Sequence, residues 1–280
     1  MTEEWYVFID VDGTLVDYRN VLPESAVTAI KAAQANGHKI YAVTGRSKAE
    51  MYEEILAIGL DGYVGGNGNY IESSGEALMH LALPLDDVEN IISWLHDKGL
   101  EYYVEANSGL YASKNFKERG KITMKEYVLG KGEQVDDQFE VEQAFPDMIF
   151  GSNPIRDDIN KISFILDAYD DYLEAKEKFA DFQVNTWGGR GEHALFGDVA
   201  GGGINKQTAL TFLEEHYELD SEYTMAFGDA NVDIPMLEYA KIGVAMASGG
   251  DDIKAMADYV TDGVAEDGLY NAFKHFGLID

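Results

Sequence analysis

The chain has 280 residues, of which 46% are hydrophobic, so it can bury a core in one large domain or two of ordinary size. Its formal charge is −30, from 51 acidic and 21 basic residues, which argues against a nucleic acid or an anionic membrane as partner. It has no cysteine, which excludes disulfides, thiolate zinc sites and cysteine nucleophiles. No apolar run approaches the length of a membrane span, and the acidic N-terminal stretch leads directly into a predicted strand, unlike a signal peptide. We therefore expect a soluble, cytoplasmic protein.

The first 83 residues predict alternating strands and helices. Residues 5–9, "WYVFI", are apolar throughout and indicate a buried strand. The further elements expected here are a helix over 23–37, a strand over 39–46, a helix over 47–59 with Ser47 as its N-cap, and a strand with a Gly-rich turn over 62–71. Short links between strands and helices are typical of βαβ units, so this segment predicts a parallel sheet.

Residues 84–189 follow a different pattern. The elements expected are a helix over 85–99, a hairpin over 101–113 that turns at Asn107-Ser108-Gly109, a strand over 161–167, a helix over 169–182 and a strand over 183–188. We interpret this stretch as an α+β insert of about 105 residues, a size at which a domain can be an independent unit.

Residues 190–280 return to the alternating pattern. The expected elements are helices over 205–217, 233–240, 251–257 and 268–277, and strands over 223–229, 242–246 and 259–261. The fold class expected for the whole chain is therefore α/β, with a parallel-sheet core that is interrupted by the insert.

Four short polar motifs stand at the ends of predicted strands or at the start of a helix. They are Asp10-Val11-Asp12-Gly13-Thr14, Thr44-Gly45-Arg46, Lys206 after a glycine run, and Gly228-Asp229-Ala230-Asn231-Val232-Asp233. The carboxyl ends of parallel strands share one edge of a sheet, where ligands bind, so we expect these motifs to converge.

Together the motifs supply carboxylates, a hydroxyl, backbone N–H groups and one lysine. Closely spaced carboxylates need a cation, and a set of oxygen ligands without His or Cys suits Mg²⁺. The hydroxyl, the N–H groups and the lysine match the oxygens of a phosphoryl group. One carboxylate is then left to attack phosphorus, and a second to transfer protons.

This arrangement resembles the haloacid dehalogenase superfamily, whose four motifs appear in order as "DVDGT", "TGR", the Lys of "GGGINKQTAL" and "GDANVD". The insert resembles the family's type IIB cap in position and size. "VGGNGNYI" and "IGVAMASGG" are similar to segments of its Cof-like phosphatase branch. The resemblance covers both core segments. It implies a Rossmann-like parallel-sheet core over 1–83 and 190–280, with an inserted α+β cap over 84–189.

The resemblance also implies a Mg²⁺-dependent phosphatase that hydrolyses a small phosphorylated metabolite, such as a sugar phosphate, through an aspartyl phosphate. Asp10 would be the nucleophile, and Asp12 the general acid and base. Thr44, Gly45 and Lys206 would bind the phosphoryl group.

The resemblance assigns the metal site to four acids. These are Asp10, Asp12 through its backbone carbonyl, Asp229, and Asp233 directly or through water. Arg46 and Asn67 are candidate substrate contacts.

The fourth motif departs from the Cof-like pattern Gly-Asp-Gly-x-Asn-Asp. Ala230 replaces the second glycine, Val232 stands where asparagine is expected, and Asn231 comes one position early. Asp229 and Asp233 keep their spacing, so we expect metal binding to survive and one polar contact near the phosphate or metal to be lost.

Two other functions remain open at this stage. A phosphomutase of sugar phosphates would use the same core motifs, and a catalytically weak sensor of a phosphorylated metabolite finds support only in Val232. Neither the substrate nor the oligomeric state can be read from the sequence.

Overall fold

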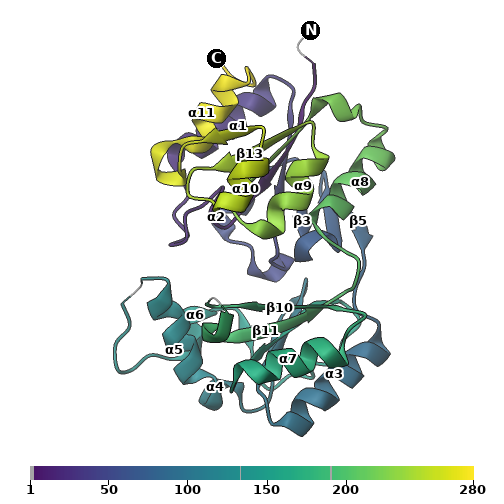
Figure 1. Ribbon diagram of the computed structural model, residues 1–280, viewed down its shortest axis with the longest axis vertical. Coiled ribbons are helices and arrows are strands. Elements are labelled where there is room, and N and C mark those ends of the chain that lie inside the picture. The colour runs from purple at the N-terminus through teal and green to yellow at the C-terminus, as the bar shows by residue number, and fades with distance from the viewer. Residues whose placement is uncertain (1–2, 133, 190) are drawn as a thin grey trace. The chain divides into compact units, whose positions relative to one another are not determined.

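The computed structural model describes residues 3–132, 134–189 and 191–280, which form two compact units. Unit 1 comprises the described residues up to Gly45 together with Met51–His80 and Ile204–Asp280. Unit 2 comprises Arg46–Glu50 and the described part of Leu81–Gly203. Each unit has its own sheet and its own hydrophobic core (Figure 1).

Unit 1 is built on an eight-stranded sheet in the order β14-β13-β12-β1-β2-β3-β4-β5. Its strands are β1 (Tyr6–Asp10), β2 (Lys39–Val43), β3 (Gly62–Gly65), β4 (Tyr70–Ser73), β5 (Glu76–His80), β12 (Thr224–Gly228), β13 (Ile242–Met246) and β14 (Tyr259–Thr261). The pairings from β14 through to β3 are parallel, and β4 and β5 join antiparallel at one edge. This sheet confirms the predicted α/β fold class.

Helices cover both faces of this sheet. They are α1 (Glu24–Ala35), α2 (Glu53–Leu56), α8 (Lys206–Tyr217), α9 (Ile234–Tyr239), α10 (Asp251–Met256) and α11 (Gly268–His275). Within β1, Val7 and Ile9 pack with α1, α2 and α11, whereas Phe8 packs with α8, α9 and α10, because successive side chains of a strand point to opposite faces. Burial on both faces explains why this strand is a continuous apolar run.

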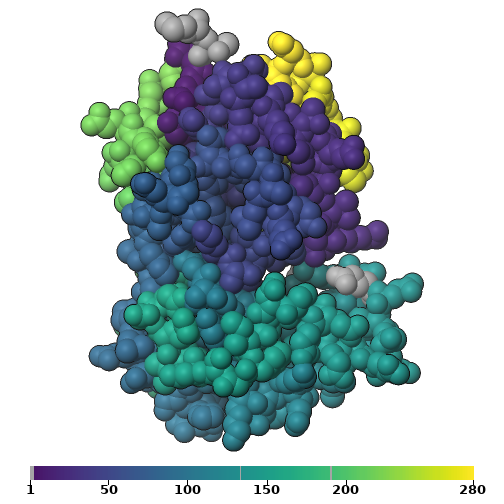
Figure 2. Space-filling model, turned by 180° about the vertical axis from the view of Figure 1, so that it is seen from behind, coloured from purple at the N-terminus to yellow at the C-terminus, as the bar shows by residue number. Residues whose placement is uncertain are grey.

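The first core segment, coloured purple to blue, makes most of the unit 1 surface seen in Figure 2, with the C-terminal residues in yellow at its margin. Among the residues that the structure describes, no helix is both long and apolar enough to span a membrane.

Unit 2 has a six-stranded sheet in the order β10-β11-β9-β6-β7-β8. Its strands are β6 (Tyr102–Ala106), β7 (Gly109–Ala112), β8 (Met148–Ile149), β9 (Ile159–Ile165), β10 (Gln183–Trp187) and β11 (Phe196–Ala200). Its helices are α3 (Leu85–Lys98), α4 (Phe116–Arg119), α5 (Lys121–Gly130), α6 (Val141–Ala144) and α7 (Tyr169–Lys178). One core joins α3 and α7 to the sheet, and a second joins α4, α5 and α6 to it, so this unit is α+β.

The boundaries of unit 2 differ from the predicted 84–189. The unit resumes at Leu81 and runs to Gly203, because β11 pairs antiparallel with both β10 and β9 and so belongs to this sheet. The prediction assigned the residues of β11 to the core segment 190–280 and expected no strand over them. Arg190, the first residue of the predicted third segment, lies outside the described residues.

The predicted helix over 47–59 is largely wrong. The structure has a 3₁₀ turn over Lys48–Glu50 and then only the short helix α2. The N–H of Ser47 donates to Glu50 Oε2 at 2.8 Å, and its hydroxyl accepts a hydrogen bond from Asn160 Nδ2 at 2.8 Å. Ser47 is therefore not the N-cap of a helix over 47–59. Its hydrogen bond with Asn160 connects residues 46–50 to the rest of unit 2.

Candidate active site

The carboxyl ends of three neighbouring strands in unit 1 carry the predicted polar residues. Asp10 is the last residue of β1, Thr44 follows β2, and Asp229 follows β12. The strand order β12-β1-β2 places these ends side by side at one edge of the sheet. All three side chains are buried, with exposed fractions of 6% for Asp10, 1% for Thr44 and 3% for Asp229.

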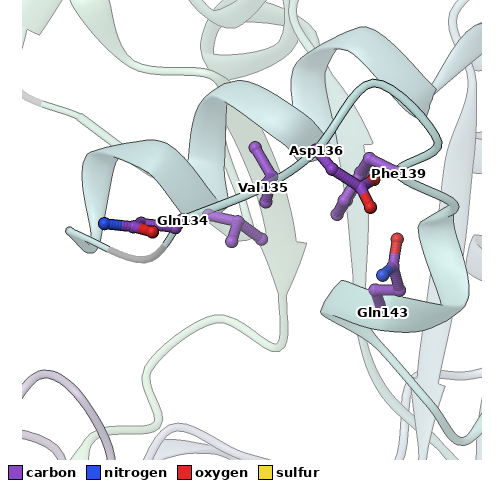
Figure 3. A pocket seen from close by; sticks show the side chains of 6 residues that line it. Gln134, Val135, Asp136, Phe139 and Gln143 are labelled. Atoms are coloured by element: carbon purple, nitrogen blue, oxygen red, sulfur yellow. The ribbon is translucent and has the colours of Figure 1, made fainter.

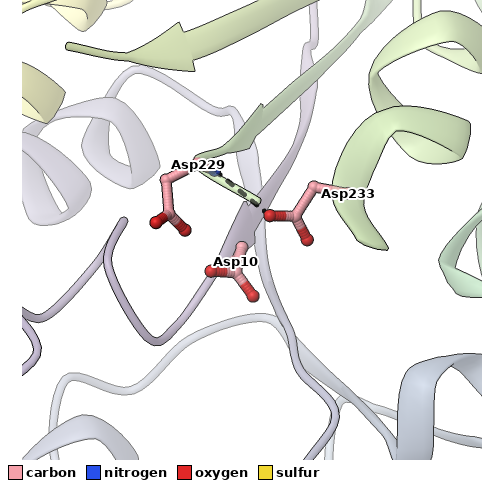
Figure 4. Close-up of side chains that lie close together, drawn as sticks. All are labelled: Asp10, Asp229 and Asp233. Atoms are coloured by element: carbon pink, nitrogen blue, oxygen red, sulfur yellow. Dashed lines mark hydrogen bonds between the residues drawn. The ribbon is translucent and has the colours of Figure 1, made fainter. Parts of the chain in front are cut away.

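Three buried aspartates form a cluster at this edge. Asp10, Asp229 and Asp233 each offer one carboxylate oxygen, and these oxygens lie within 4.8 Å of one another. Figure 4 shows the three side chains at the end of β1, just after β12 and at the start of the following helix. Such a concentration of buried negative charge requires positive charge close by.

Lys206 supplies one such charge. It is the first residue of α8, is only 1% exposed, and follows the N-cap Asn205, whose side chain accepts from the N–H of Thr208. Its Nζ lies 2.5 Å from Asp10 Oδ1 and 2.6 Å from Asp233 Oδ1, and it donates to the backbone oxygen of Val43 at 3.2 Å. The ammonium therefore joins two of the three aspartates.

The surroundings shift the pKa values of this cluster. Burial, followed by the charge of Asp233, raises the pKa of Asp10 well above its ordinary value, although Lys206 opposes the shift. Burial also raises the pKa of Asp229 to about 6. Burial alone would lower the pKa of Lys206, but the carboxylates of Asp10 and Asp233 outweigh it and raise that pKa, so the lysine stays charged.

Both oxygens of Asp233 are engaged. Oδ1 faces Lys206, and Oδ2 accepts from the N–H groups of Asp229 and Ala230 at 3.1 and 3.0 Å. Gly228 allows this approach, because a Cβ there would lie 2.4 Å from the Cβ of Asp233. Asp233 thus fixes the turn that carries Asp229.

The loop after β1 closes around Asp229. Gly13 has φ +94° and passes so close that a Cβ would lie 2.4 Å from Asp229 Oδ2. Thr14 Oγ1 donates to Asp229 Oδ1 at 3.4 Å, and the Tyr18 hydroxyl hydrogen-bonds to Asp229 Oδ2. Sequence reasoning missed Tyr18, because it lies outside every motif and nothing in its local sequence distinguishes it.

The second motif is arranged around Thr44. Its N–H donates to the backbone oxygen of Val64, and its own carbonyl accepts from the N–H of Asn67, both at 2.9 Å. The Asn67 side chain lies over Gly45, where a Cβ would meet its Oδ1 at 3.1 Å. Asn67 thus adjoins the phosphate-binding candidates, whereas Arg46 belongs to unit 2 and reaches the backbone oxygen of Glu50 at 3.4 Å.

Two further residues of the motifs are more exposed. Asp12 is partly buried, and its backbone forms a bridge with Val16. Val232 is 49% exposed, and the neighbouring Asn231 reaches Asp252 Oδ2 at 3.4 Å. Asn231 therefore does not take over a polar role near the aspartates.

The donor set fits a magnesium ion. Asp10, Asp229 and Asp233 offer only oxygen, and the one lysine in their midst leaves them with excess negative charge. Burial, with the nearby charge of Asp233, raises the pKa values of Asp10 and Asp229, and a divalent cation would stabilise their charged forms. Mg²⁺ favours a few carboxylates with water and phosphate oxygens as its remaining ligands.

A separate pocket in unit 2 holds none of the candidate residues (Figure 3). Its lining residues are Val128, Gln134, Val135, Asp136, Phe139 and Gln143. Among its lining residues that the structure describes, Asp136 is the one carboxylate and none is a base.

A parallel sheet whose strand ends bring buried aspartates and a lysine together is typical of proteins that transfer phosphoryl groups. The chain belongs to the haloacid dehalogenase-like hydrolases, whose family model matches residues 7–273. Four motifs in the expected order had predicted this membership.

Similar proteins agree with this assignment. Phosphatase YwpJ of Bacillus subtilis is 26% identical over 285 residues, covering 96% of this chain and 98% of that protein. The 5-amino-6-(5-phospho-D-ribitylamino)uracil phosphatase YcsE of the same organism is 27% identical over 274 residues, covering 97% and 95%. The solved structure of the subclass IIB sugar phosphatase BT4131 superposes with a TM-score of 0.74 at 28% identity, covering 98% and 100%. The chain is therefore a hydrolase of phosphate esters.

Proposed function

We propose that the protein is a Mg²⁺-dependent phosphatase that hydrolyses small phosphorylated metabolites, sugar phosphates foremost, through an aspartyl phosphate on Asp10. The observation that carries this proposal is the buried Asp10 carboxylate, which contacts Lys206 and lies in one cluster with Asp229. The similar structure BT4131 is that of a sugar phosphatase, which supports the choice of substrate class.

The metal would be held by the carboxylates of Asp10 and Asp229 and by the backbone carbonyl of Asp12. When bound, Mg²⁺ supplies positive charge that neutralises phosphoryl oxygens. Asp233 belongs to the same cluster and would act on the metal directly or through water. Its oxygens also accept hydrogen bonds from Lys206 and from the N–H groups of Asp229 and Ala230, which orients the lysine and the turn that carries Asp229.

In the first step, an Asp10 carboxylate oxygen attacks phosphorus and the bond from phosphorus to the ester oxygen breaks. Asp12 donates a proton to that oxygen, which leaves as an alcohol. Lys206 and the Thr44 hydroxyl, with the backbone at Gly45, hold the phosphoryl oxygens. Because Asp12 is less buried than Asp10, its carboxyl group can exchange protons with the leaving group and with water.

In the second step, Asp12 accepts a proton from a water molecule whose oxygen attacks phosphorus. The bond between phosphorus and the Asp10 oxygen breaks, inorganic phosphate is released, and Asp10 is regenerated. Lys206 stabilises the Asp10 carboxylate as it re-forms.

We propose unit 2 as the cap that selects the substrate, with Arg46 and Asn67 as substrate contacts. Its size and its own hydrophobic cores support an independently packed domain. Lids of this kind exclude water during the reaction.

The test is the substitution Asp10→Asn, compared with Asp86→Asn, which changes an exposed acid of α3. With an aryl phosphate and Mg²⁺, Asp10→Asn should lose at least about 10³-fold in turnover, because it removes the nucleophile. Asp86→Asn should keep the activity of the original chain. Intact-mass analysis of a rapidly quenched reaction should detect one phosphoryl group on the original chain and none on Asp10→Asn.

Retention of most activity by a folded Asp10→Asn variant would refute the mechanism. A separate screen measures the release of inorganic phosphate from a set of phosphorylated metabolites, and the metabolite that is hydrolysed fastest identifies the substrate. Isomerisation of a sugar phosphate without phosphate release would identify a phosphomutase instead.

A further inference from the structure

Tyr18 occupies an unusual position for a surface residue. The residue is 57% exposed, yet its hydroxyl hydrogen-bonds to Oδ2 of Asp229, a residue that is only 3% exposed. An aromatic ring left largely in water gains little from burial, so hydrophobic packing does not account for its position. The contact with Asp229 does.

The loop that carries Tyr18 is internally fixed. Asp17 Oδ1 accepts from the N–H groups of Arg19 and Val21 at 2.9 and 2.8 Å, and the N–H of Asp17 donates to the backbone oxygen of Val21 at 3.1 Å. Asn20 adopts φ +65°, which closes the turn. These bonds hold the backbone of Tyr18 before any ligand binds.

The carboxylate of Asp229 is contacted by residues that lie far from it in sequence. Thr14 donates to Oδ1 and Tyr18 to Oδ2, while Gly13 passes against the carboxylate. Each carboxylate oxygen has two lone pairs, so an oxygen that accepts a hydrogen bond can still bind a metal ion.

We propose that Tyr18 is a positioning residue for magnesium: its hydroxyl holds the Asp229 carboxylate in the orientation that the ion requires. This inference rests on the proposed metal site. Hydrogen bonds from outer residues fix the rotamer of a metal ligand, and their loss typically weakens metal binding about 10- to 100-fold. Tyr18 thus makes a surface loop part of the metal site.

The experiment measures Mg²⁺ affinity by isothermal titration calorimetry on the full chain without substrate. Tyr18→Phe removes only the hydroxyl. The matched control is Tyr239→Phe, which removes a phenol-to-carboxylate hydrogen bond of 2.6 Å to Glu214 in the same unit. We expect Tyr18→Phe to raise the dissociation constant about tenfold or more, with Tyr239→Phe unchanged.

Each other outcome overturns a defined part of this inference. If Tyr18→Phe binds Mg²⁺ as Tyr239→Phe does, Tyr18 has no positioning role. If it binds Mg²⁺ more tightly, the hydroxyl competes with the ion. If the original chain itself binds no Mg²⁺, the metal site of the proposed function is refuted, and Tyr18 has nothing to position.

Discussion

The Nζ of Lys206 lies 2.5 Å from Oδ1 of Asp10, although 196 residues separate them in sequence. Both side chains are buried in unit 1. The contact joins the two core segments that the insert divides, and it balances part of the charge of the aspartate cluster. The same pair thus serves stability and the proposed chemistry.

Replacing Lys206 with Met should destabilise the protein strongly. The substitution keeps the apolar stem but leaves buried carboxylates uncompensated, which typically costs about 3–5 kcal/mol. The control is Lys39→Met, because Lys39 is 42% exposed and its ion pair with Asp61 should contribute about 1 kcal/mol or less. Urea unfolding without divalent cations measures both. If Lys206→Met lost as little unfolding free energy as Lys39→Met, Lys206 would not be compensating the buried carboxylates.

Gly13 offers a second test, because Gly37 has nearly the same φ angle. Their φ angles are +94° and +95°, but a Cβ at Gly13 would lie 2.4 Å from Asp229 Oδ2, whereas one at Gly37 would meet nothing within 4 Å. Gly37→Ala should cost about 1–2 kcal/mol of backbone strain, and Gly13→Ala clearly more. Unfolding free energies measure the difference, and Gly13→Ala should also weaken Mg²⁺ binding by displacing Asp229. Equal losses of unfolding free energy for the two variants would show that the Asp229 side chain moves away from the added Cβ without cost.

The sequence predicted the core fold and the convergence of the polar motifs well, because both follow local rules. The apolar run before Asp10 indicated a buried strand, and polar residues at the ends of parallel strands must meet at one edge. Strand β11 was missed, because its Gly197 and Asp198 have low strand propensity and only pairing with β9 and β10 holds it extended.

Contacts between residues far apart in sequence could not be predicted from local sequence patterns. Tyr18 is one of 17 tyrosines, and its partner Asp229 lies 211 residues away, so no local pattern reveals their hydrogen bond. The helix expected over 47–59 failed for a similar reason, because Ser47 makes its hydrogen bond to Asn160, 113 residues further along the chain. Tertiary contacts there override the local propensity.

Magnesium affinity should fall in acid. Burial raises the pKa of metal-free Asp229 to about 6, and Mg²⁺ binds the deprotonated carboxylate. Binding below that pH must therefore expel a proton from Asp229, and a second from Asp10 wherever its raised pKa keeps it protonated, so the affinity should drop at least about tenfold per pH unit as the pH falls. Calorimetric titrations from about pH 5 to about pH 7.5 measure this slope. Asp229→Asn should bind Mg²⁺ weakly throughout, and an affinity of the original chain that is constant over this range would exclude protonation of Asp229.

Unit 2 contains a second buried acid, Glu105 on β6. Its Oε1 accepts from Ser163 at 2.6 Å, and its Oε2 lies 3.1 Å from Nζ of Lys161. Burial, followed by the charge of Glu50, raises its pKa to about 8, although Lys161 opposes the shift. The folded chain therefore keeps a proton on Glu105 at pH values where the unfolded chain has lost it.

Glu105→Gln should remove a pH dependence of stability. Because the folded pKa exceeds the unfolded value of about 4.5, the folded state of the original chain binds more protons between that pH and about 8. Its free energy of unfolding should fall as pH rises through this window, by up to about 1.4 kcal/mol per pH unit relative to Glu105→Gln. Urea unfolding at several pH values measures this difference, with the exposed Glu53→Gln as control. Parallel profiles for the original chain and Glu105→Gln would show that Glu105 is already ionised throughout.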